Sequence, residues 1–274
     1  MRYVFFGTPD FAAIILEKLV KAGLPPVLVV CNPDRPVGRK KIITPPPVKQ
    51  RIMNFESGIR QRIKIIQPEK LDPSLFLIPN SQFDFFIIAA YAKILPKEII
   101  DIPRLGAIGV HPSLLPKYRG ATPIQSVILN GEKETGVTLF LIDEKIDHGK
   151  IVASSKQQVS SKDNYESLIK KMAELAADLL IKTLPKFLNG EITPEAQNEN
   201  EATYTKKFTS EDAYVDLEKD DPLIVERKVR ALNPEPGVWS IINGKRTKIL
   251  ETEIIDGKLK LKKIQVEGKR PQIA

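Results

Sequence analysis

The sequence has few residues suited to disulfide or metal chemistry. It contains a single cysteine, Cys31, and two histidines among 274 residues. One thiol excludes an internal disulfide, and the apolar run around Cys31 predicts a buried, inert side chain. No apolar stretch approaches the ~20 residues that a bilayer-spanning helix needs. The first residues, MRYVFFGTPDF, do not form a signal or transit peptide, so we expect a cytoplasmic protein that does not bind membranes.

A glycine-rich dinucleotide-binding loop is also lacking. The sequence after the first expected strand is GTPDFA, without the three glycines that bring a pyrophosphate onto a helix N-terminus. This argues against a nicotinamide site. Asp10 in the same segment is a predicted N-cap of the first helix.

Positive charge is what the sequence has in excess. It holds 42 lysines and arginines against 34 aspartates and glutamates, a formal net charge of +8. Such an excess favours encounter with polyanions such as nucleic acid, although scattered surface lysines also produce it. Hydrophobic residues at 42% and charged residues at 28% are typical of a globular chain with a sizeable core. Composition therefore leaves both a nucleic-acid partner and an ordinary basic surface open.

The first half of the chain predicts an α/β fold. Short β-branched or aromatic runs alternate with segments of helical period, which is typical of βαβ units. We therefore expect a Rossmann-like, mostly parallel sheet. The expected strands are 3–6, 27–31, 63–67, 85–89, 107–110, 137–142 and 151–158, with helices at 11–22 and 122–129.

The middle of the chain predicts a domain boundary. From 164 to 188, apolar residues recur at three- and four-residue spacing, which predicts an amphipathic helix capped by Asn164. The next segment, NGEITPEAQNENEAT, is polar and has no period, which is typical of a linker. We therefore expect a catalytic domain over residues 1–188 and a linker over 189–203.

The remaining residues, 204–274, predict a small C-terminal domain. A helix is expected at 221–232, followed by short strands separated by Asn-Gly and Asp-Gly turn signals. This pattern is typical of an OB-like β-barrel, a fold often used to follow a nucleic-acid backbone. The expected strands are 238–242, 248–255 and 259–266.

Two loops contain the residues best suited to catalysis. The segment HPSLLPKYRGA begins at His111, directly after an expected strand, and ligands bind at the carboxyl ends of strands in open α/β sheets. His111 is therefore a candidate general base. The loop DEKIDHG, residues 143–149, has three acidic residues beside His148. A carboxylate near an imidazole can orient it and raise its basicity, but a solvated acidic turn fits the spacing equally well.

Several longer segments follow one another in the order found in a known enzyme family. They resemble the methionyl-tRNA formyltransferases, which are folate-dependent formyltransferases. Two blocks, HPSLLP and ETGVT, are shared by several folate-dependent formyltransferases, so they indicate the reaction more firmly than the acceptor. The segments are FFGTPDFA (5–12), PDRPVGRKK (33–41), QPEKL (67–71), AYAKILP (90–96), HPSLLPKYRGATPIQ (111–125), GEKETGVTLFLIDEKIDHG (131–149) and EGKRP (267–271).

The resemblance implies transfer of a formyl group from 10-formyltetrahydrofolate to the α-amine of initiator methionyl-tRNA. It implies that His111 transfers protons and that Asp147 is its acidic partner. The reaction needs no metal, and we expect a monomer. The implied folate-lining residues are Ser113, Leu114, Leu115 and Pro116, and the implied tRNA-contacting residues are Arg39, Lys40 and Lys41.

Gly109 departs from the family pattern, which has an asparagine two positions before the histidine. An amide there donates to the oxyanion of the intermediate, and losing one such donor costs ~3 kcal/mol. A water, a main-chain amide or His148 supplies the bond instead, or the enzyme is impaired. If nothing else donates, Gly109→Asn is expected to raise the rate. The resemblance also implies a shortened C-terminal domain, which ends soon after EGKRP.

Alternative functions remain open. A sugar-nucleotide N-formyltransferase shares the folate half of the site, but its acceptor does not need the basic loop or the lysine-rich C-terminal domain. A catalytically impaired homologue that binds folate or tRNA is suggested by Gly109. A purine-pathway formyltransferase is disfavoured because that family usually lacks a second domain.

Overall fold

The computed structural model describes residues 1–38, 40–77 and 82–274. These residues form two compact units, each assembled from three segments of the chain. Unit 1 comprises Met1–Arg119, Gly136–Gln157 and Lys170–Ala202, and unit 2 comprises Gly120–Thr135, Gln158–Ile169 and Thr203–Ala274.

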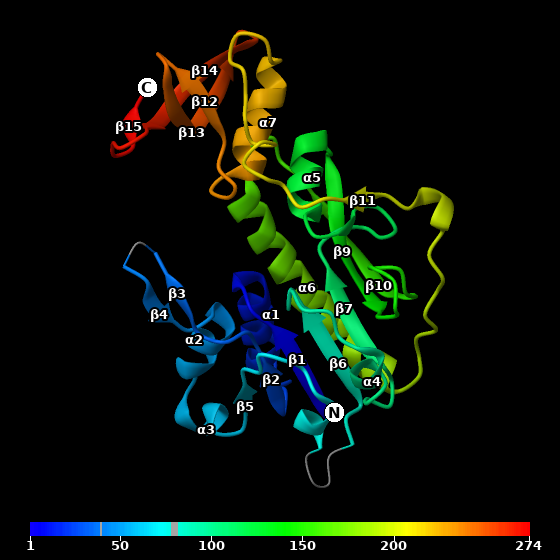
Figure 1. Ribbon diagram of the computed structural model, residues 1–274. Coiled ribbons are helices and arrows are strands. Elements are labelled where there is room, and N and C mark those ends of the chain that lie inside the picture. Colours follow the sequence, from blue (N-terminus) through cyan, green and yellow to red (C-terminus); the bar gives the residue numbers. More distant parts are fainter. Residues whose placement is uncertain (39, 78–81) are drawn as a thin grey trace. The chain divides into compact units, whose positions relative to one another are not determined.

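A seven-stranded sheet organises unit 1 (Figure 1). The strand order is β10-β9-β7-β6-β1-β2-β5. Pairs β1–β2, β1–β6, β2–β5 and β6–β7 are parallel, whereas β9 runs antiparallel to β7. The mostly parallel sheet expected from the sequence is confirmed. The strands are β1 (Tyr3–Gly7), β2 (Leu28–Val30), β5 (Lys64–Ile66), β6 (Phe85–Ala89), β7 (Ala107–His111), β9 (Glu134–Leu141) and β10 (Ile151–Gln158).

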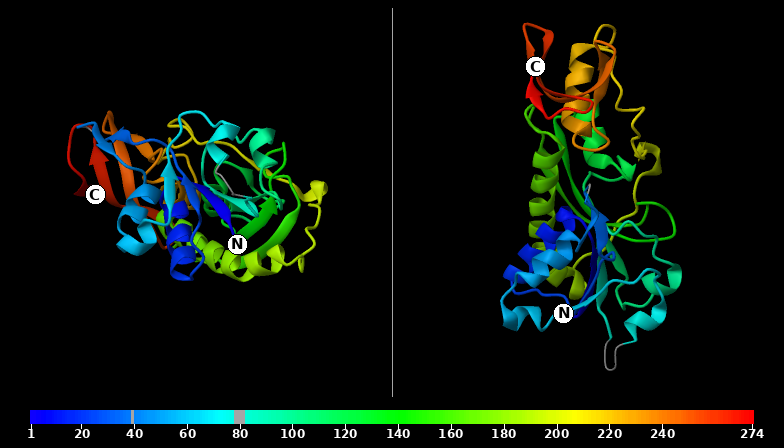
Figure 2. Two further views of the ribbon diagram at one scale, coloured as in Figure 1. Left: turned by 90° about the horizontal axis from the view of Figure 1, so that it is seen from below. Right: turned by 60° about the vertical axis from the view of Figure 1, so that its left-hand side comes forward.

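Helices cover both faces of this sheet (Figure 2), which is why its central strands are continuously apolar. Helices α1 (Asp10–Lys21) and α6 (Tyr165–Leu188) lie side by side, joined by a 2.8 Å ion pair between Lys18 and Asp178. An aromatic cluster around Phe6 and Phe86 fills the core together with Tyr91. The shorter helices are α2 (Pro47–Met53), α3 (Ser57–Arg60), η1 (Pro73–Phe76), α4 (Lys97–Ile100) and η2 (Glu199–Glu201).

Some local expectations are confirmed and one is wrong. Cys31 is buried, and the Asn164 side chain accepts a 2.9 Å hydrogen bond from the Ser167 amide at the start of α6. Asp10 does not cap α1, because its own backbone is already helical and the extended residue before it, Pro9, occupies the cap position. Its carboxylate lies in the first turn, where negative charge is favourable.

Unit 2 contains a four-stranded antiparallel sheet in the order β12-β13-β14-β15. Asn243, Gly244, Asp256 and Gly257 all have positive φ, so both predicted turns form hairpins of the expected kind. The elements are α5 (Pro123–Asn130), β11 (Tyr204–Thr205), α7 (Pro222–Leu232), β12 (Trp239–Ile242), β13 (Lys245–Ile255), β14 (Lys258–Val266) and β15 (Gln272–Ile273).

Within the described part of the chain, none of the helices combines the length and the apolar character needed to span a bilayer.

Candidate functional site

His111 is the last residue of β7, and its two ring nitrogens have different partners. Its side chain is only 7% exposed. Nε2 lies 2.8 Å from the Tyr118 carbonyl oxygen. Because a carbonyl can only accept, Nε2 carries a proton. Nδ1 faces Asp147, with 3.5 Å to Oδ2. The nitrogen free to take up a proton is therefore the one beside the carboxylate.

The loop that contains Asp147 has to fold back to reach His111. Because β9 is antiparallel to β7, its last residues lie beside the start of β7, where Ile142 N donates to Ala107 O. His111 is three residues beyond Ile108 on β7, which is roughly 10 Å along the strand. Asp147 itself has a φ of 47°, a left-handed conformation that costs non-glycine residues roughly 1–2 kcal/mol. The surrounding contacts must hold this loop.

Those contacts come from a segment that sequence analysis treated as a linker. The Gln197 amide group donates to the carbonyl oxygens of Asp147, at 2.9 Å, and Gly149, at 2.8 Å. Glu195 pairs with Ile151 of β10 in an isolated bridge. No periodicity or motif marks Gln197, because its role depends on tertiary contacts.

Arg119 fixes the position of the Gln197 side chain. Its side chain is completely buried, and its Nε and Nη2 donate to Gln197 Oε1 at 3.1 and 2.7 Å. Its guanidinium also bonds both carboxylate oxygens of Glu199, at 3.0 and 2.6 Å. The bond from Arg119 holds the pKa of Glu199 below its usual range. Arg119 lies within the HPSLLPKYRGA segment, where no sequence pattern predicts this role.

The expected folate-lining segment is fixed against β9. Thr138 Oγ1 donates to Ser113 O at 2.7 Å and accepts from Leu115 N at 3.0 Å. The Ser113 hydroxyl donates to Lys117 O at 2.6 Å, so it is already used within the loop. Ser113 and Leu115 are buried, and Leu114 and Pro116 are half-buried. This segment offers apolar surface and main-chain groups directly beside His111.

The loop after β6, residues 90–96, is held in an unusual conformation. Ala90 and Ala92 both have positive φ, and Tyr91 between them is buried against Phe6. Burial raises the pKa of Tyr91 to about 12. Its hydroxyl has no hydrogen-bond partner among the described residues. Lys93 Nζ ties the loop to the carbonyls of residues 68 and 69, at 2.8 and 2.9 Å.

Gly109 lies opposite Phe140 in the β7–β9 pair. A Cβ atom at position 109 would overlap the Phe140 ring, so a larger residue fits only if that ring moves. His148 is also constrained, since Nδ1 is 2.7 Å from Asp143 Oδ2 and Nε2 is 3.6 Å from Glu199 Oε1. Both ring nitrogens of His148 therefore face carboxylates, which makes it a poor source of an oxyanion hydrogen bond.

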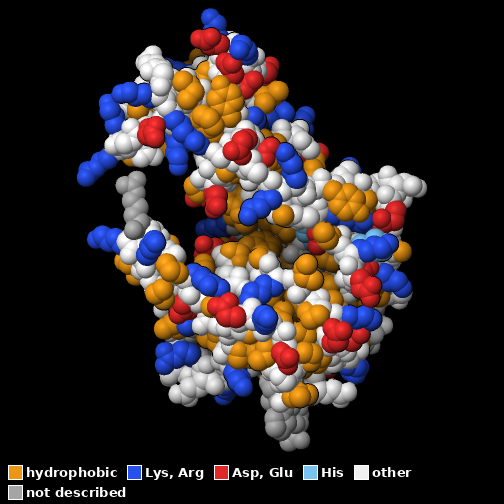
Figure 3. Space-filling view, in the orientation of Figure 1, with side chains coloured by type: hydrophobic (Ala, Val, Ile, Leu, Met, Phe, Trp, Pro, Cys, Tyr) orange, Lys and Arg blue, Asp and Glu red, His pale blue; other side chains and the backbone are white. Residues whose placement is uncertain are grey.

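The basic loop is an antiparallel hairpin that sequence analysis did not predict, formed by β3 (Arg35–Val37) and β4 (Ile42–Thr44). Lys40 and Lys41 are exposed beside the hairpin strands. Arg39 lies outside the described residues. On the face shown in Figure 3, lysine and arginine side chains are spread among acidic ones rather than gathered in one patch.

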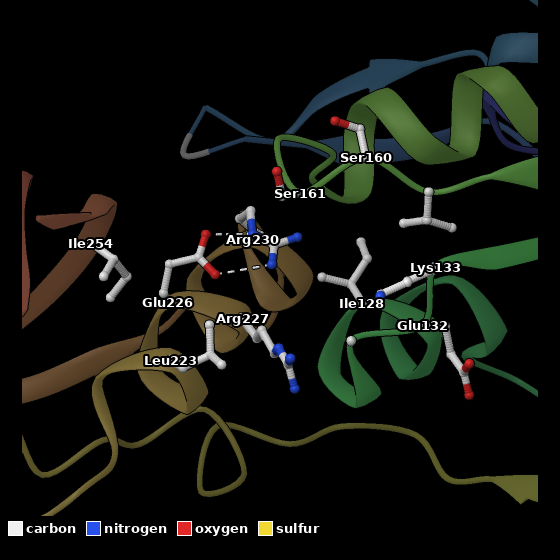
Figure 4. Close-up of a pocket in the computed structure, with 12 residues that line it drawn as sticks. Ile128, Glu132, Lys133, Ser160, Ser161, Leu223, Glu226, Arg227, Arg230 and Ile254 are labelled. Atoms are coloured by element: carbon white, nitrogen blue, oxygen red, sulfur yellow. Dashed lines mark hydrogen bonds and ion pairs between the residues drawn. The ribbon is translucent and has the colours of Figure 1, made fainter. Parts of the chain in front are cut away.

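Unit 2 has a cavity of about 340 Å³ lined by residues of α5, α7 and the segment 159–161 (Figure 4). Arg227 lies against Gly131, the left-handed residue that ends α5, where positive charge is favourable. Arg230 pairs with Glu226 in the same cavity. These cations have structural partners, and no residue predicted for catalysis lines the cavity.

Among the residues that the structure describes, no cluster of three or more histidine, cysteine, aspartate or glutamate side chains could hold a metal ion.

Known proteins resemble this chain in both sequence and fold. Residues 1–184 match the formyl transferase family model, and residues 207–271 match the model of the formyl transferase C-terminal domain. The methionyl-tRNA formyltransferase of Enterococcus faecalis is 40% identical over 250 residues, which cover 90% of this chain and 78% of that protein.

Two solved structures share the fold. The methionyl-tRNA formyltransferase from Clostridium thermocellum superposes with a TM-score of 0.63 at 17% identity, covering 97% of this chain and 98% of that one. An N-formyltransferase from Helicobacter canadensis, solved with folinic acid and dTDP-3-aminofucose, has a TM-score of 0.63 at 20% identity, covering 97% and 95%. With matches over most of its length in both sequence and fold, this chain belongs to the formyl transferase family.

Proposed function

We propose that this chain transfers the formyl group of 10-formyltetrahydrofolate to the α-amine of initiator methionyl-tRNA. The observation that carries the proposal is the 40% identity, over 90% of the chain, to the methionyl-tRNA formyltransferase of Enterococcus faecalis. The sugar-modifying relative from Helicobacter canadensis shares the fold at only 20% identity. Both comparisons support a formyltransferase, and the sequence likeness favours tRNA as the acceptor.

The reaction needs one proton acceptor that later becomes a donor. The α-amine forms a bond to the formyl carbon, the bond from that carbon to folate N10 breaks, the amine loses a proton and N10 gains one. In this proposal His111 takes the proton at Nδ1, since Nε2 is held by the Tyr118 carbonyl. The Asp147 carboxylate, 3.5 Å away, stabilises the resulting imidazolium. His111 then returns the proton to N10.

The oxyanion of the tetrahedral intermediate needs a donor other than a side chain at position 109. Gly109 has no side chain, and both nitrogens of His148 face carboxylates. We therefore assign the oxyanion to a main-chain amide or a bound water, which can provide the same kind of stabilisation.

The remaining predicted residues bind the two substrates in this proposal. The segment Ser113–Pro116, which the Thr138 hydroxyl holds in place, lines the folate site in this proposal. Lys40 and Lys41, together with Arg39, contact tRNA phosphates. The exposed positions of the two lysines support this role, because phosphate contacts need solvent-accessible cations.

We further propose that the protein acts as a monomer in the cytoplasm. The contacts among His111, Asp147, Gln197 and Arg119 are all made within one chain, which is compatible with a monomer. Its proposed substrates belong to translation. Sedimentation of the purified protein at several concentrations checks the oligomeric state, and a mass of two chains contradicts the proposal.

The acceptor is tested by incubating purified protein with 10-formyltetrahydrofolate and either methionyl-tRNA or an amino-sugar nucleotide. We expect formylated methionyl-tRNA. Formylation of the sugar nucleotide alone overturns the choice of acceptor, and formylation of neither substrate identifies a silent homologue.

A further inference from the structure

The loop that contains the proposed catalytic carboxylate is held by side chains that lie far from it in the sequence. Gln197 contacts the backbone on both sides of His148, at Asp147 and Gly149. Glu199 lies 3.6 Å from the His148 ring, which in turn bonds Asp143 at the start of the loop. The short stretch 197–199 therefore contacts the loop with two side chains.

The Gln197 amide has a fixed orientation. Its nitrogen donates both of its protons, to the carbonyls of Asp147 and Gly149, and its oxygen accepts from two nitrogens of Arg119. A flipped amide would place its oxygen against two carbonyl oxygens and its nitrogen against a guanidinium, which has no acceptor. All donors and acceptors of this amide are satisfied in only one of its two orientations.

Arg119 makes this contact rigid. Its side chain is fully buried, and a two-pronged bond to Glu199 fixes the plane of the guanidinium. The guanidinium that bonds Gln197 therefore cannot rotate without breaking its charge-assisted hydrogen bonds to Glu199. The position of Arg119, eight residues after His111 in the chain, ties this support to the loop that follows β7.

The bond from Gln197 acts on the backbone torsion that aims the carboxylate. Asp147 has a left-handed φ of 47°, and the bonded carbonyl is that of Asp147 itself. If this peptide rotates, the Asp147 carboxylate moves away from His111 Nδ1. A misplacement of about 1 Å at a catalytic group can cost 10²-fold in rate.

We propose that Gln197, supported by Arg119, is a positioning residue that holds the Asp147 carboxylate beside His111 during formyl transfer. The inference rests on the proposed function for the identity of the reaction. Gln197 touches neither substrate in this assignment, so it acts only through Asp147.

The test compares two substitutions at position 197. Gln197→Glu keeps an oxygen that can accept from Arg119 but loses both donors to the loop, and Gln197→Met loses the donors and the acceptor. We expect each to lower the single-turnover rate by about 10- to 100-fold, with folate affinity nearly unchanged. Gln197→Met should also lower the thermal unfolding midpoint more than Gln197→Glu does, because it removes an acceptor from the buried Arg119 guanidinium. The matched control is Asn198→Ala, because among the described residues the Asn198 side chain bonds its near neighbours Asn200 and Glu201. It should leave the rate unchanged.

A double-mutant cycle with Asp147→Asn separates positioning from a general structural effect. If Gln197 acts by aiming the carboxylate, Gln197→Met should cost much less in the Asp147→Asn background than in the wild type. The same fold-loss in both backgrounds overturns the inference, as does a wild-type rate in Gln197→Glu.

The test of Gln197 does not depend on which acceptor the protein uses. The cycle is measured with whichever acceptor the wild-type protein formylates, methionyl-tRNA or an amino-sugar nucleotide. Failure of the tRNA alone therefore overturns only the acceptor, and a wild type that formylates neither overturns both proposals.

Discussion

At the residue scale, the partners of the two His111 ring nitrogens support its proposed role in proton transfer. Nε2 is committed to the Tyr118 carbonyl, so Nδ1 is the only ring nitrogen that can gain a proton. In this proposal the Asp147 carboxylate faces the lone pair of His111 Nδ1 before proton transfer. After proton transfer it faces an imidazolium. The pair therefore favours the charged state that forms during the reaction, which is the condition for catalysis by differential stabilisation.

We predict that His111→Ala and Asp147→Ala each lower the single-turnover rate by at least ~10², the range of a lost general base. Because both residues act on one proton, the double variant should be little slower than the slower single variant. Folate binding, measured by titration, should survive in all three variants. A near-wild-type rate in either single variant contradicts these roles.

Gly109 shows how packing changes an expectation drawn from resemblance. The resemblance predicts that Gly109→Asn raises the rate if no other group donates to the oxyanion, because the substitution adds an amide donor. The structure removes the space for it, since a Cβ atom there would overlap the Phe140 ring. Any effect of Gly109→Asn on the rate therefore includes the cost of moving the Phe140 ring as well as the effect of a new amide donor.

We predict that Gly109→Asn destabilises the fold by about 1–3 kcal/mol, the usual cost of overpacking. In a Phe140→Leu background the same substitution should cost less, because the smaller side chain leaves room. Urea unfolding of the four proteins measures this coupling. An equal cost in both backgrounds would show that the Phe140 ring does not limit position 109.

At the element scale, the strands with a clear pattern were predictable and the short irregular elements were not. Strand β6 matches its expected bounds because FFIIA is a continuous apolar run between polar residues. The hairpin β3–β4 was missed, since RPVGRKKIIT combines a proline, a glycine and four cations with few apolar residues. Its strands are exposed, and no burial pattern exists for a sequence to show.

The same distinction applies to the candidate site. His111 and Asp147 were chosen as candidates because a strand end and a turn rich in acidic residues have recognisable sequences, and because the family resemblance implies them. Gln197 was missed, since a polar segment without period is typical of a linker. Its proposed role depends on the tertiary structure, which brings Gln197 beside Arg119 and the loop that contains Asp147.

A polar cluster joins three elements near the end of β2. Lys49 of α2 donates to both Asp34 oxygens and to Gln67, which follows β5. The hydrogen bond from Lys49 is the main cause that lowers the pKa of Asp34. A carboxyl group with a depressed folded-state pKa adds stability above its unfolded pKa, and this stability is lost as pH falls through the folded pKa.

We therefore predict that Lys49→Met weakens the acid dependence of stability below about pH 4, near the ordinary pKa of aspartate. The difference in unfolding free energy between wild type and variant should be constant near pH 7 and should shrink as the pH falls. Denaturant unfolding across this range measures it. Parallel curves at all pH values would contradict the assignment to Asp34.

At the scale of the whole molecule, the net charge is +8, and on the face shown in Figure 3 lysine and arginine side chains are spread among acidic ones. The basic hairpin therefore has to be separated experimentally from the general attraction of a cationic protein for tRNA. Its contribution should appear as specific phosphate contacts, each of which releases condensed counterions.

We predict that replacing Arg39, Lys40 and Lys41 by alanine raises the apparent KM for tRNA and flattens its salt dependence, while the KM for folate stays unchanged. The matched control removes three exposed lysines of α6, with Lys170→Ala, Lys182→Ala and Lys186→Ala. A smaller effect in this control assigns the difference to the hairpin. Equal loss toward folate and tRNA in the hairpin variant would mean that the hairpin is structural.

The most direct test of the account is a competition assay with isotopically labelled 10-formyltetrahydrofolate. Methionyl-tRNA and an amino-sugar nucleotide are offered together to the purified protein, and His111→Ala is run in parallel. We expect the label to appear on methionyl-tRNA and its rate of appearance to fall by at least ~10² in His111→Ala. Label on the sugar nucleotide instead, or a rate that does not depend on His111, would contradict it.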